Sequence, residues 1–537
     1  MIRNLIAALA LLASPALAAQ DPVVNAPAGA LQGRTEGMVH VFKGIPYAQP
    51  PVKGLRWRPP VALPPWTGVK LAQDFGPACI QSTVKLGGVY DQDIGAIGED
   101  CLTLNVWAPA DARGAPVFVW IHGGALWGGT AKEQLYDGAR MAERGVVVVT
   151  INYRLGVLGW LAHPGLSKES PLQISGNYGL LDQVAALTWI KNNIGAFGGD
   201  ASNVTIAGES AGGLSVMYLM ASPYARGLFH KAIAESAYMA STQELKHARH
   251  GTPAAEDAGS LLAAALQAPN VAALRAMDAQ ALTAAAARAG FQPFGAIDGH
   301  VLPKQLVDTF DSGEQAHVPL LAGFNSGEIR TLKILAPPVP ADAAIYEKEI
   351  RARYGDLAEA FLKQYPATDL QESIWATTRD ALYGWTAERL VRKQAAIGQP
   401  SYLYLFDHST PAEDAAGLHG FHASELPYVF GTIDRTPPNW PKIPATDRAF
   451  SDAMLDYWTS FAKSGVPRAA GAPDWPAYGS DGNYMDFAQT PRAARDLLPG
   501  MYTLNEEVVC RRRADGGIPW HWNVGLVSPP LPPKAGC

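Results

Sequence analysis

The sequence predicts an α/β fold in which a large, mostly parallel and twisted central sheet is flanked by helices. Three strand-length runs support this prediction, at residues 117–121, 146–152 and 204–207. The second run (VVVVTIN) is apolar on both faces, which is typical of a strand buried in a parallel sheet. Between the last two runs, residues 179–194 carry apolar side chains at helical spacing. The order strand, helix, strand favours parallel strands joined by covering helices.

Later segments continue the same pattern. Residues 320–322 and 401–406 are strand-length apolar runs, which we expect to join the sheet. Residues 254–290, 341–364 and 449–464 have helical patterns. The chain also contains 53 glycines and 42 prolines, a surplus that predicts many turns and long connections.

Composition excludes several classes of protein. The 537 residues include 43 basic and 49 acidic ones, and the net charge of −6 gives no electrostatic reason to expect nucleic acid or an anionic membrane as a partner. Apolar residues make up 48% of the chain, which excludes a disordered protein.

The first residues have the pattern of a secretory signal peptide. Arg3 supplies a positive start, residues 5–13 are apolar, and Ala16-Leu17-Ala18 is a small-x-small cleavage site. The apolar run is too short to span a bilayer, which needs about 20 residues. We therefore expect cleavage after residues 1–18, and an exported protein, periplasmic or secreted, without a membrane anchor.

Four cysteines would then lie in an oxidising compartment, where an even number favours disulfides. They are Cys79, Cys101, Cys510 and Cys537, and they allow three pairings. The spacing favours the local pairs 79–101 and 510–537, although a terminal Cys537 could also be free.

The segment Gly208-Glu209-Ser210-Ala211-Gly212 is a G-x-S-x-G motif. It follows the predicted strand 204–207 and precedes a helix-like run at 214–220, which is the strand–turn–helix setting that a nucleophilic serine requires. On such a tight turn, side chains larger than glycine at positions 208 and 212 would clash. Backbone N–H groups at the start of the helix favour a nearby negative charge. We therefore predict that Ser210 is a nucleophile.

A second glycine-rich turn, His122-Gly123-Gly124-Ala125, follows the predicted strand 117–121. Small residues allow backbone N–H groups to approach a developing alkoxide, and each such donor stabilises the transition state by about 2.7–4 kcal/mol. We predict an oxyanion hole made by the N–H groups of Gly124, Ala125 and Ala211.

Three longer motifs surround these turns: residues 197–213 (FGGDASNVTIAGESAGG), 99–107 (EDCLTLNVW) and 42–60 (FKGIPYAQPPVKGLRWRPP). They resemble the serine signature, the second signature and the N-terminal block of the type-B carboxylesterases, the carboxylesterase/cholinesterase family of the α/β-hydrolase fold. The resemblance implies an α/β-hydrolase with long loop and helical insertions that form an active-site cleft. It also implies a Cys79–Cys101 disulfide.

The same resemblance implies partners for Ser210. The family places its acid in a short glycine-containing loop after a strand, and Glu328 in the segment NSGE matches it. The family's histidine precedes an acidic residue and a Val-Phe-Gly turn, which matches His422. His419 is the alternative, but its distance to that turn differs. The implied triad is Ser210, Glu328 and His422, with the histidine as general base and the glutamate orienting it.

Other residues are expected around this triad. By resemblance, Glu209 and Ser236 are buried polar residues that support it. Trp127 follows the oxyanion loop and is expected to form a wall of the substrate pocket, although a packed core tryptophan fits equally well. The family commonly has a third glycine at Ala125, whose methyl group should narrow the site while its N–H remains.

Two features of the sequence bear on the substrate. The loop between Cys79 and Cys101 contains Tyr90 as its one aromatic residue, whereas cholinesterases carry there a tryptophan that faces a quaternary ammonium, so choline esters are disfavoured. Arg330 and Lys333 follow the predicted acid and would favour an acid part with free carboxylates, as in the tricarballylate esters of fumonisin toxins. The alternative is a solvated basic face.

The predicted function is that of a serine carboxylic-ester hydrolase, acting through an acyl-enzyme on a small to medium organic ester. No cofactor is expected, and no metal, because the histidine pairs 419/422 and 247/250 lack a third ligand. The alternatives are a generic short-acyl or aryl carboxylesterase, an acyltransferase that differs only in its acceptor, and a non-catalytic binding protein on the same fold. Because residues 210, 328 and 422 must meet, we expect residues 19–537 to form one hydrolase domain.

Overall fold

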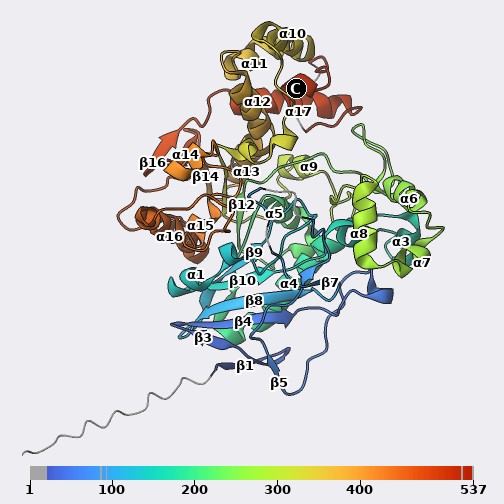
Figure 1. The fold of residues 1–537 in the computed structure, drawn as a ribbon, viewed down its shortest axis with the longest axis vertical. Coiled ribbons are helices and arrows are strands. Elements are labelled where there is room, and N and C mark those ends of the chain that lie inside the picture. Colours follow the sequence, from blue (N-terminus) through green and yellow to red (C-terminus); the bar gives the residue numbers. More distant parts are fainter. Residues whose placement is uncertain (1–20, 85–87, 92, 522–523, 535–536) are drawn as a thin grey trace, which may run out of the picture.

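An eleven-stranded sheet runs through the molecule (Figure 1). The computed structural model describes residues 21–84, 88–91, 93–521, 524–534 and 537, so the predicted signal peptide lies outside the described residues. The strands of this sheet are β3 (Arg34–Glu36), β4 (Val39–Pro46), β8 (Thr103–Pro109), β9 (Ala115–Ile121), β10 (Val147–Ile151), β11 (Gly199–Glu209), β12 (Lys231–Glu235), β13 (Leu320–Asn325), β14 (Ser401–Phe406), β15 (Asn483–Phe487) and β16 (Pro491–Arg495).

The strand order is β16-β15-β14-β13-β12-β11-β9-β10-β8-β4-β3. In this order, each strand between β15 and β10 is parallel to its neighbours within that range. At the two edges, β16 is antiparallel to β15, and β8, β4 and β3 each pair antiparallel with the strand before them in the order. The prediction of a large, mostly parallel sheet is therefore confirmed. Two small sheets lie near the beginning of the described chain, formed by β1 (Val23–Ala26), β2 (Gly29–Gln32) and β5 (Val69–Leu71), and by β6 (Ala78–Cys79) and β7 (Ile97–Gly98).

Both faces of the large sheet are buried. In β9, Val119 enters the core on one face and Trp120 the core on the other, and both side chains are fully buried. The first face is covered by α4 (Tyr178–Asn193), α5 (Ala211–Ala221) and α13 (Trp385–Ala396), and the second by α1 (Ala139–Glu143), α15 (Leu426–Val429) and α16 (Arg448–Ser464). Burial on both faces explains why the central strands are continuous apolar runs.

The helical region 254–290 is divided into three helices: α6 (Ala255–Ala265), α7 (Val271–Ala276) and α8 (Ala279–Arg288). The side chains of Asn270 and Asp278 start the second and third helices by accepting backbone N–H groups at 2.9 Å. The region 341–364 is likewise divided, into α10 (Ala343–Tyr354) and α11 (Ala358–Gln364). Within the described ranges, no helix is long and apolar enough to cross a membrane.

Two groups of helices project beyond the sheet (Figure 1). After β12, the helices α6, α7 and α8 form a small core with α2 (Gly156–Trp160) and α3 (Pro164–Glu169). After β13, the helices α10, α11 and α12 (Leu370–Arg379) form another with α17 (Met501–Asp515). These groups are the long insertions that the family resemblance implies.

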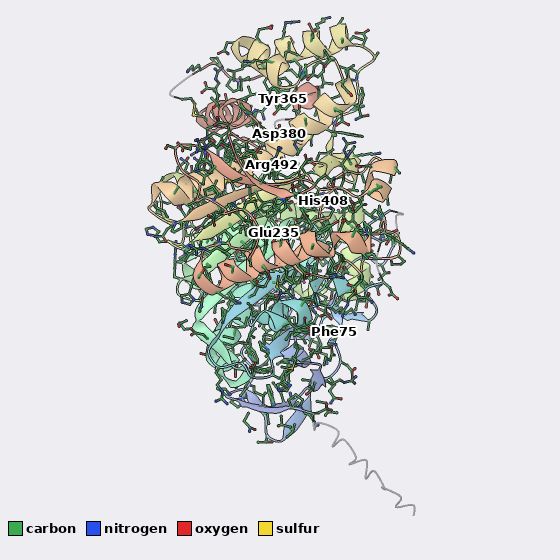
Figure 2. The ribbon with its side chains drawn as sticks, turned by 90° about the vertical axis from the view of Figure 1, so that its left-hand side faces the viewer. Phe75, Glu235, Tyr365, Asp380, His408 and Arg492 are labelled. Atoms are coloured by element: carbon green, nitrogen blue, oxygen red, sulfur yellow. A yellow bond between two sulfur atoms is a disulfide. The ribbon has the colours of Figure 1, made fainter. Side chains whose placement is uncertain are left out.

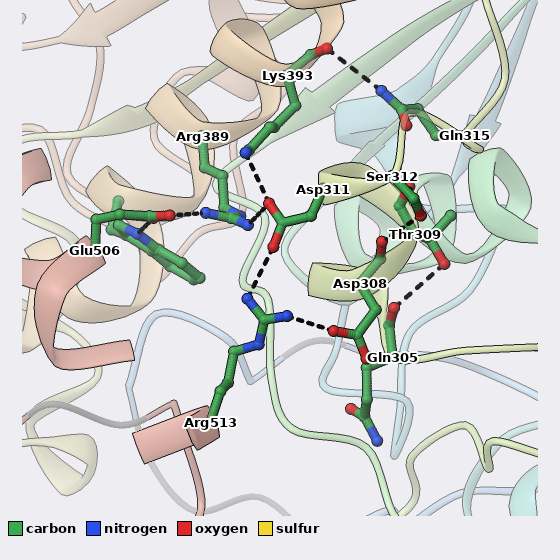
Figure 3. A network of polar contacts seen from close by, with 11 residues as sticks. Gln305, Asp308, Thr309, Asp311, Ser312, Gln315, Arg389, Lys393, Glu506 and Arg513 are labelled. Carbon is green, nitrogen blue, oxygen red and sulfur yellow. Dashed lines mark hydrogen bonds and ion pairs between the residues drawn. The ribbon is translucent and has the colours of Figure 1, made fainter. Parts of the chain in front are cut away.

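A charged network ties the second group to the rest of the molecule (Figure 3). Arg389 of α13 is fully buried and forms ion pairs with Asp311 of α9 (Leu306–Asp311) and with Glu506 of α17. Asp311 also binds Lys393 at 2.7 Å and Arg513 at 2.8 Å. Carboxylates on two sides offset the cost of burying the guanidinium. The network therefore fixes α13 relative to α9 and α17.

Both predicted disulfides are present. Cys79 and Cys101 are bonded with a Cα–Cα distance of 5.0 Å, and Cys510 and Cys537 with one of 5.8 Å. The first disulfide closes the loop that contains Tyr90. The second attaches the last described residue to α17.

A buried ion pair joins the end of β10 to α4. The Nε and Nη2 groups of Arg154 each donate to a carboxylate oxygen of Asp182 at 2.7 Å, and the Arg154 backbone N–H donates at 3.0 Å. The two side chains are only 4% and 0% exposed, so water cannot replace a lost partner.

Replacing Asp182 by asparagine should lower the free energy of unfolding by about 3–5 kcal/mol, because the Arg154 charge stays buried without its counter-ion. Urea denaturation followed by tryptophan fluorescence measures the loss. Glu314→Gln is the matched control, since it breaks an exposed pair with Lys304 and should leave the urea midpoint unchanged. Equal midpoints for Asp182→Asn and the wild type would contradict this reading of the pair.

Candidate active site

The predicted site residues follow neighbouring parallel strands. Ser210 comes directly after β11 and Ser236 directly after β12, Glu328 follows β13 by three residues, and His422 lies in the connection after β14. Parallel strands place their carboxyl ends at one edge of a sheet, where open α/β sheets bind ligands. Ser210 and His422, which are more than 200 positions apart in the sequence, therefore lie at the same edge of the sheet.

Two glycines make the turn that carries Ser210. The serine has φ 57° and ψ −120°, a strained conformation typical of a nucleophile on a strand-to-helix turn. A Cβ atom on Gly208 would lie 2.5 Å from the carbonyl carbon of Gly212, and one on Gly212 would lie 2.0 Å from the carbonyl oxygen of Ile121. Both positions therefore require glycine, for the steric reason that the motif indicates.

Glu328 and His422 are in contact although they lie 94 residues apart. The Nδ1 atom of His422 forms a hydrogen bond with Oε2 of Glu328, whose Oε1 accepts the Asn325 N–H at 2.8 Å. The two loops are joined directly, because the Gly327 N–H donates to the carbonyl oxygen of Gly420 at 2.7 Å. Glu328 is fully buried, so its carboxylate is held toward the imidazole.

The other ring nitrogen of His422 faces Glu209. Nε2 lies 3.1 Å from Oε1 of Glu209, the residue directly before Ser210. The structure does not join Ser210 to His422, since the serine hydroxyl makes no hydrogen bond to any described residue. Such catalytic hydrogen bonds often tighten only when a substrate binds. His419, the alternative histidine, instead pairs with Asp414 at 2.9 Å and is about half exposed.

Two carboxylates stabilise the charged form of His422. Burial lowers its pKa, but Glu209 and Glu328 together outweigh this effect and raise the pKa of His422 to about 9. Burial raises the pKa of Glu209 to about 7, against the opposing effect of His422. Protonated His422 is therefore the favoured form at neutral pH.

Two further glutamates lie in the same buried region. Glu235, visible in Figure 2, accepts a hydrogen bond from Trp458 Nε1 at 2.7 Å, and Glu425 accepts one from Asn325 Nδ2 at 2.5 Å. Burial raises the pKa of Glu235 to about 8 and that of Glu425 well above its ordinary value. Ser236 is also buried, and its hydroxyl has no partner among the described residues. Sequence reasoning missed both glutamates, although an acid three positions after the predicted histidine was a signal for Glu425.

The N–H groups predicted for the oxyanion hole are available. Gly124 and Ala125 are exposed and have φ values of 98° and 54°, and no hydrogen bond within the described ranges uses their N–H groups. Ala211 is the first residue of α5, where N–H groups have no intrahelical acceptor. A Cβ atom on Gly123 would lie 3.2 Å from Cβ of Ser210, so this loop rests directly against the serine.

Aromatic side chains lie beside these groups. Trp127 is half-buried and contacts Phe291 edge to face, with ring centroids 6.1 Å apart. The Tyr90 hydroxyl donates to the carbonyl oxygen of His422 at 2.7 Å. The ring of Tyr383 lies 5.3 Å from the ring of His422. Sequence reasoning considered Tyr90 only as the aromatic residue of its loop, and it missed Tyr383.

Arg330 and Lys333 have different surroundings. The Nη2 group of Arg330 donates to both carboxylate oxygens of Glu372, at 2.8 and 2.9 Å, and its guanidinium lies over the ring of Trp375. Lys333 is exposed, with its Nζ 5.5 Å from the centre of the same ring. The charge of Arg330 is thus already neutralised within the protein.

The chain as a whole is similar to known proteins. Residues 20–503 match the model of the carboxylesterase family. A fumonisin B1 esterase from Sphingopyxis macrogoltabida is 36% identical over 489 residues, which cover 87% of each chain. The para-nitrobenzyl esterase of Bacillus subtilis is 37% identical, over 85% of this chain and 92% of that protein. A solved PNB esterase structure matches with a TM-score of 0.78 at 33% identity, over 90% of this chain and 99% of the other. The chain therefore belongs to the carboxylesterase family and is a carboxylic-ester hydrolase.

Proposed function

We propose that this hydrolase forms an acyl-enzyme on Ser210, with His422 as general base and Glu328 as the acid of the triad. The observation that carries the proposal is the buried Glu328–His422 hydrogen bond at the sheet edge where Ser210 occupies its strained turn. His422 takes the proton of Ser210 as the oxygen attacks the ester carbonyl, and then donates it to the leaving alcohol. Glu328 keeps the imidazole in the required tautomer and stabilises its charged form.

The oxyanion of the tetrahedral intermediate would bind to the N–H groups of Gly124, Ala125 and Ala211. A water molecule then attacks the acyl-enzyme with His422 again as the base, and the acid leaves Ser210. Glu209 would support the reaction electrostatically, because its carboxylate is 3.1 Å from Nε2 and favours the imidazolium that forms in both steps. Ser236 would complete the buried polar surroundings.

We also infer that residues 19–537 act as one domain and that the mature protein is exported, to the periplasm or the medium. One eleven-stranded sheet takes up strands from β3 near the start of the chain to β16 near its end, which favours one domain. The cleavage pattern near Ala18 and the two disulfides favour export.

The substrate is proposed to be a small to medium organic ester, and more narrowly an ester of a polycarboxylic acid. The relative named fumonisin B1 esterase supports this narrower class. Because Glu372 already neutralises Arg330, we expect Lys333 to be the cation that a substrate carboxylate contacts. A generic short-acyl or aryl carboxylesterase is the alternative, and an acyltransferase would use the same acyl-enzyme.

Ser210→Ala and His422→Ala should each reduce kcat/KM for p-nitrophenyl acetate by about four to six orders of magnitude, because each change disables the same proton transfer. His419→Ala is the control and should keep the wild-type rate. A fluorophosphonate should label the wild type and His419→Ala but not Ser210→Ala. A Ser210→Ala rate equal to that of the wild type would refute the assignment of Ser210 as the nucleophile.

The pH profile should depend on Glu209. His422 must be neutral to accept a proton, so kcat/KM for an uncharged ester should rise with pH toward the raised pKa of His422, about 9. In Glu209→Gln a neutral amide no longer stabilises the imidazolium, so the pKa of His422 falls and the acid limb moves to lower pH.

Glu235→Gln is the matched control for this profile. The charges that raise the pKa of His422 are those of Glu209 and Glu328 and not that of Glu235, so Glu235→Gln should leave the acid limb in place. An acid limb that stays fixed in Glu209→Gln, or that moves in both variants, would refute the electrostatic role of Glu209.

A preference for anionic acyl groups can be tested with p-nitrophenyl esters of glutaric and hexanoic acid, which differ in the terminal carboxylate. Lys333→Ala should lower kcat/KM about two- to fivefold for the glutaryl ester and leave the hexanoyl ester unchanged, as expected for one exposed charge pair. Lys304→Ala removes an equal charge outside the proposed site and should affect neither ester. Parallel losses with both esters would exclude Lys333 as a carboxylate contact.

A further inference from the structure

The loop that carries two of the proposed oxyanion donors has a strained backbone. Gly124, Ala125 and Leu126 follow one another with φ values of 98°, 54° and 59°. Glycine adopts such values freely, whereas a residue with a side chain does so only at an energetic cost. Two successive non-glycine residues in this conformation persist only where their surroundings hold them. The loop therefore needs contacts that fix its backbone.

Two groups of contacts hold the first half of this loop. The Tyr153 hydroxyl donates to the carbonyl oxygen of His122 at 2.8 Å, and its ring stacks on the imidazole with centroids 4.5 Å apart. The Gly156 N–H donates to the carbonyl oxygen of Leu126 at 2.7 Å, and the Leu126 side chain is fully buried. The loop is thus attached to the core at its start and at its middle.

The second half of the loop folds back on the first. The carbonyl oxygen of Gly124 accepts the N–H groups of Trp127 at 2.9 Å and of Gly128 at 3.0 Å. A Cβ atom on Gly124 would lie 2.3 Å from the carbonyl oxygen of Gly128, so the two halves are in contact. A Cβ atom on Gly129 would likewise lie 2.6 Å from the carbonyl oxygen of Gly123. The place of the second half therefore determines where Gly124 lies.

The side chain of Gln81 holds this second half from outside the loop. Its Oε1 accepts the Gly129 N–H at 2.9 Å, and its Nε2 donates to the Gly129 carbonyl oxygen, also at 2.9 Å. Nε2 donates as well to the carbonyl oxygen of Cys79 at 3.1 Å. Gln81 is only 4% exposed. One buried amide thus binds both backbone groups of a single loop residue, as a neighbouring strand would.

Two attachments hold the segment that carries Gln81. The disulfide joins Cys79 to Cys101, which lies two residues before β8 of the large sheet. Asn152, the residue directly after β10, donates through Nδ2 to the carbonyl oxygen of Pro77 at 3.1 Å. Both attachments lead to strands of the large sheet. Gln81 is therefore a fixed link between this sheet and the second half of the oxyanion loop.

We propose that Gln81 is a positioning residue, which keeps the N–H groups of Gly124 and Ala125 directed at the oxyanion by holding Gly129. This inference rests on the proposed oxyanion hole and on Ser210 as the nucleophile. Oxyanion donors act on the charge that develops in the transition state, so a displaced loop weakens binding of the transition state more than binding of the ester. Loss of Gln81 should therefore lower kcat and leave KM nearly unchanged.

The test uses Gln81→Met, which has a side chain of similar length and makes neither hydrogen bond to Gly129. Its kcat for p-nitrophenyl acetate should fall about 10- to 100-fold, since a misplacement of about 1 Å can cost 10²-fold, and KM should stay within about threefold. A trifluoromethyl ketone binds a nucleophilic serine as a tetrahedral adduct, so its Ki should rise by a similar factor. All values are expressed per molecule of Ser210 titrated with a fluorophosphonate, which leaves unfolded protein out of them.

Gln305→Met is the matched control. Gln305 is also buried, and it binds both backbone groups of Thr242, at 2.9 and 2.6 Å, in the connection between β12 and α6. This change removes the same kind of double hydrogen bond from a different loop. It should lower stability and keep the kcat and the Ki of the wild type.

Gln81→Asn provides a second variant if Gln81→Met does not fold, because it keeps the amide but is one methylene too short to make both bonds. It should show the same fall in kcat and the same rise in Ki. A wild-type kcat or a wild-type Ki in the Gln81 variants, or equal changes in Gln305→Met, would overturn the proposal. A wild-type enzyme that neither reacts with the fluorophosphonate nor binds the ketone would instead mean that the proposed triad has failed.

Discussion

The common direction of β11, β12, β13 and β14 is the constraint on which the site depends. Each strand ends at the same edge, so Glu209, Glu235, Glu328 and His422 come together without any long-range adjustment of the chain. The hydrogen bond from the Gly327 N–H to Gly420 then locks the acid loop to the histidine loop. The helical insertions are added between these strands, and the sheet itself is not interrupted by them.

The buried region holds four carboxyl groups around one imidazole, and this balance explains its electrostatics. Burial raises the pKa values of Glu235 and Glu425, which favours their uncharged, hydrogen-bonding forms. Glu209 and Glu328 share one positive partner, His422. Desolvation thus limits the negative charge that accumulates in this region. The negative charge of Glu209 and Glu328 still raises the pKa of His422 and makes the histidine a stronger base.

Local features of the fold and site were predictable from sequence, and non-local ones were not. The strands are continuous apolar runs, and the glycines at 208 and 212 reveal their turn because the clash they avoid is local. Glu328 had no local signal, since its contact with His422 spans 94 residues, and it was identified by resemblance alone. The ion pair of Arg330 depends on Glu372, 42 residues away, so sequence reasoning left this cation free. Tyr383 was missed because a π-helix has no recognisable pattern in the sequence.

Residues Asp380–Gly384 form a π-helix between α12 and α13, and this feature bears on how such an enzyme can change over generations. One residue turns an α-helix by about 100°, because 3.6 residues complete a turn. Deleting a single codon within 380–384 would restore a regular helix and rotate the residues before the deletion relative to α13. The phenol could then be exchanged for another side chain beside His422 without any substitution in the triad. Insertion and deletion, as well as substitution, are therefore available routes by which the surroundings of this histidine can diverge in this fold.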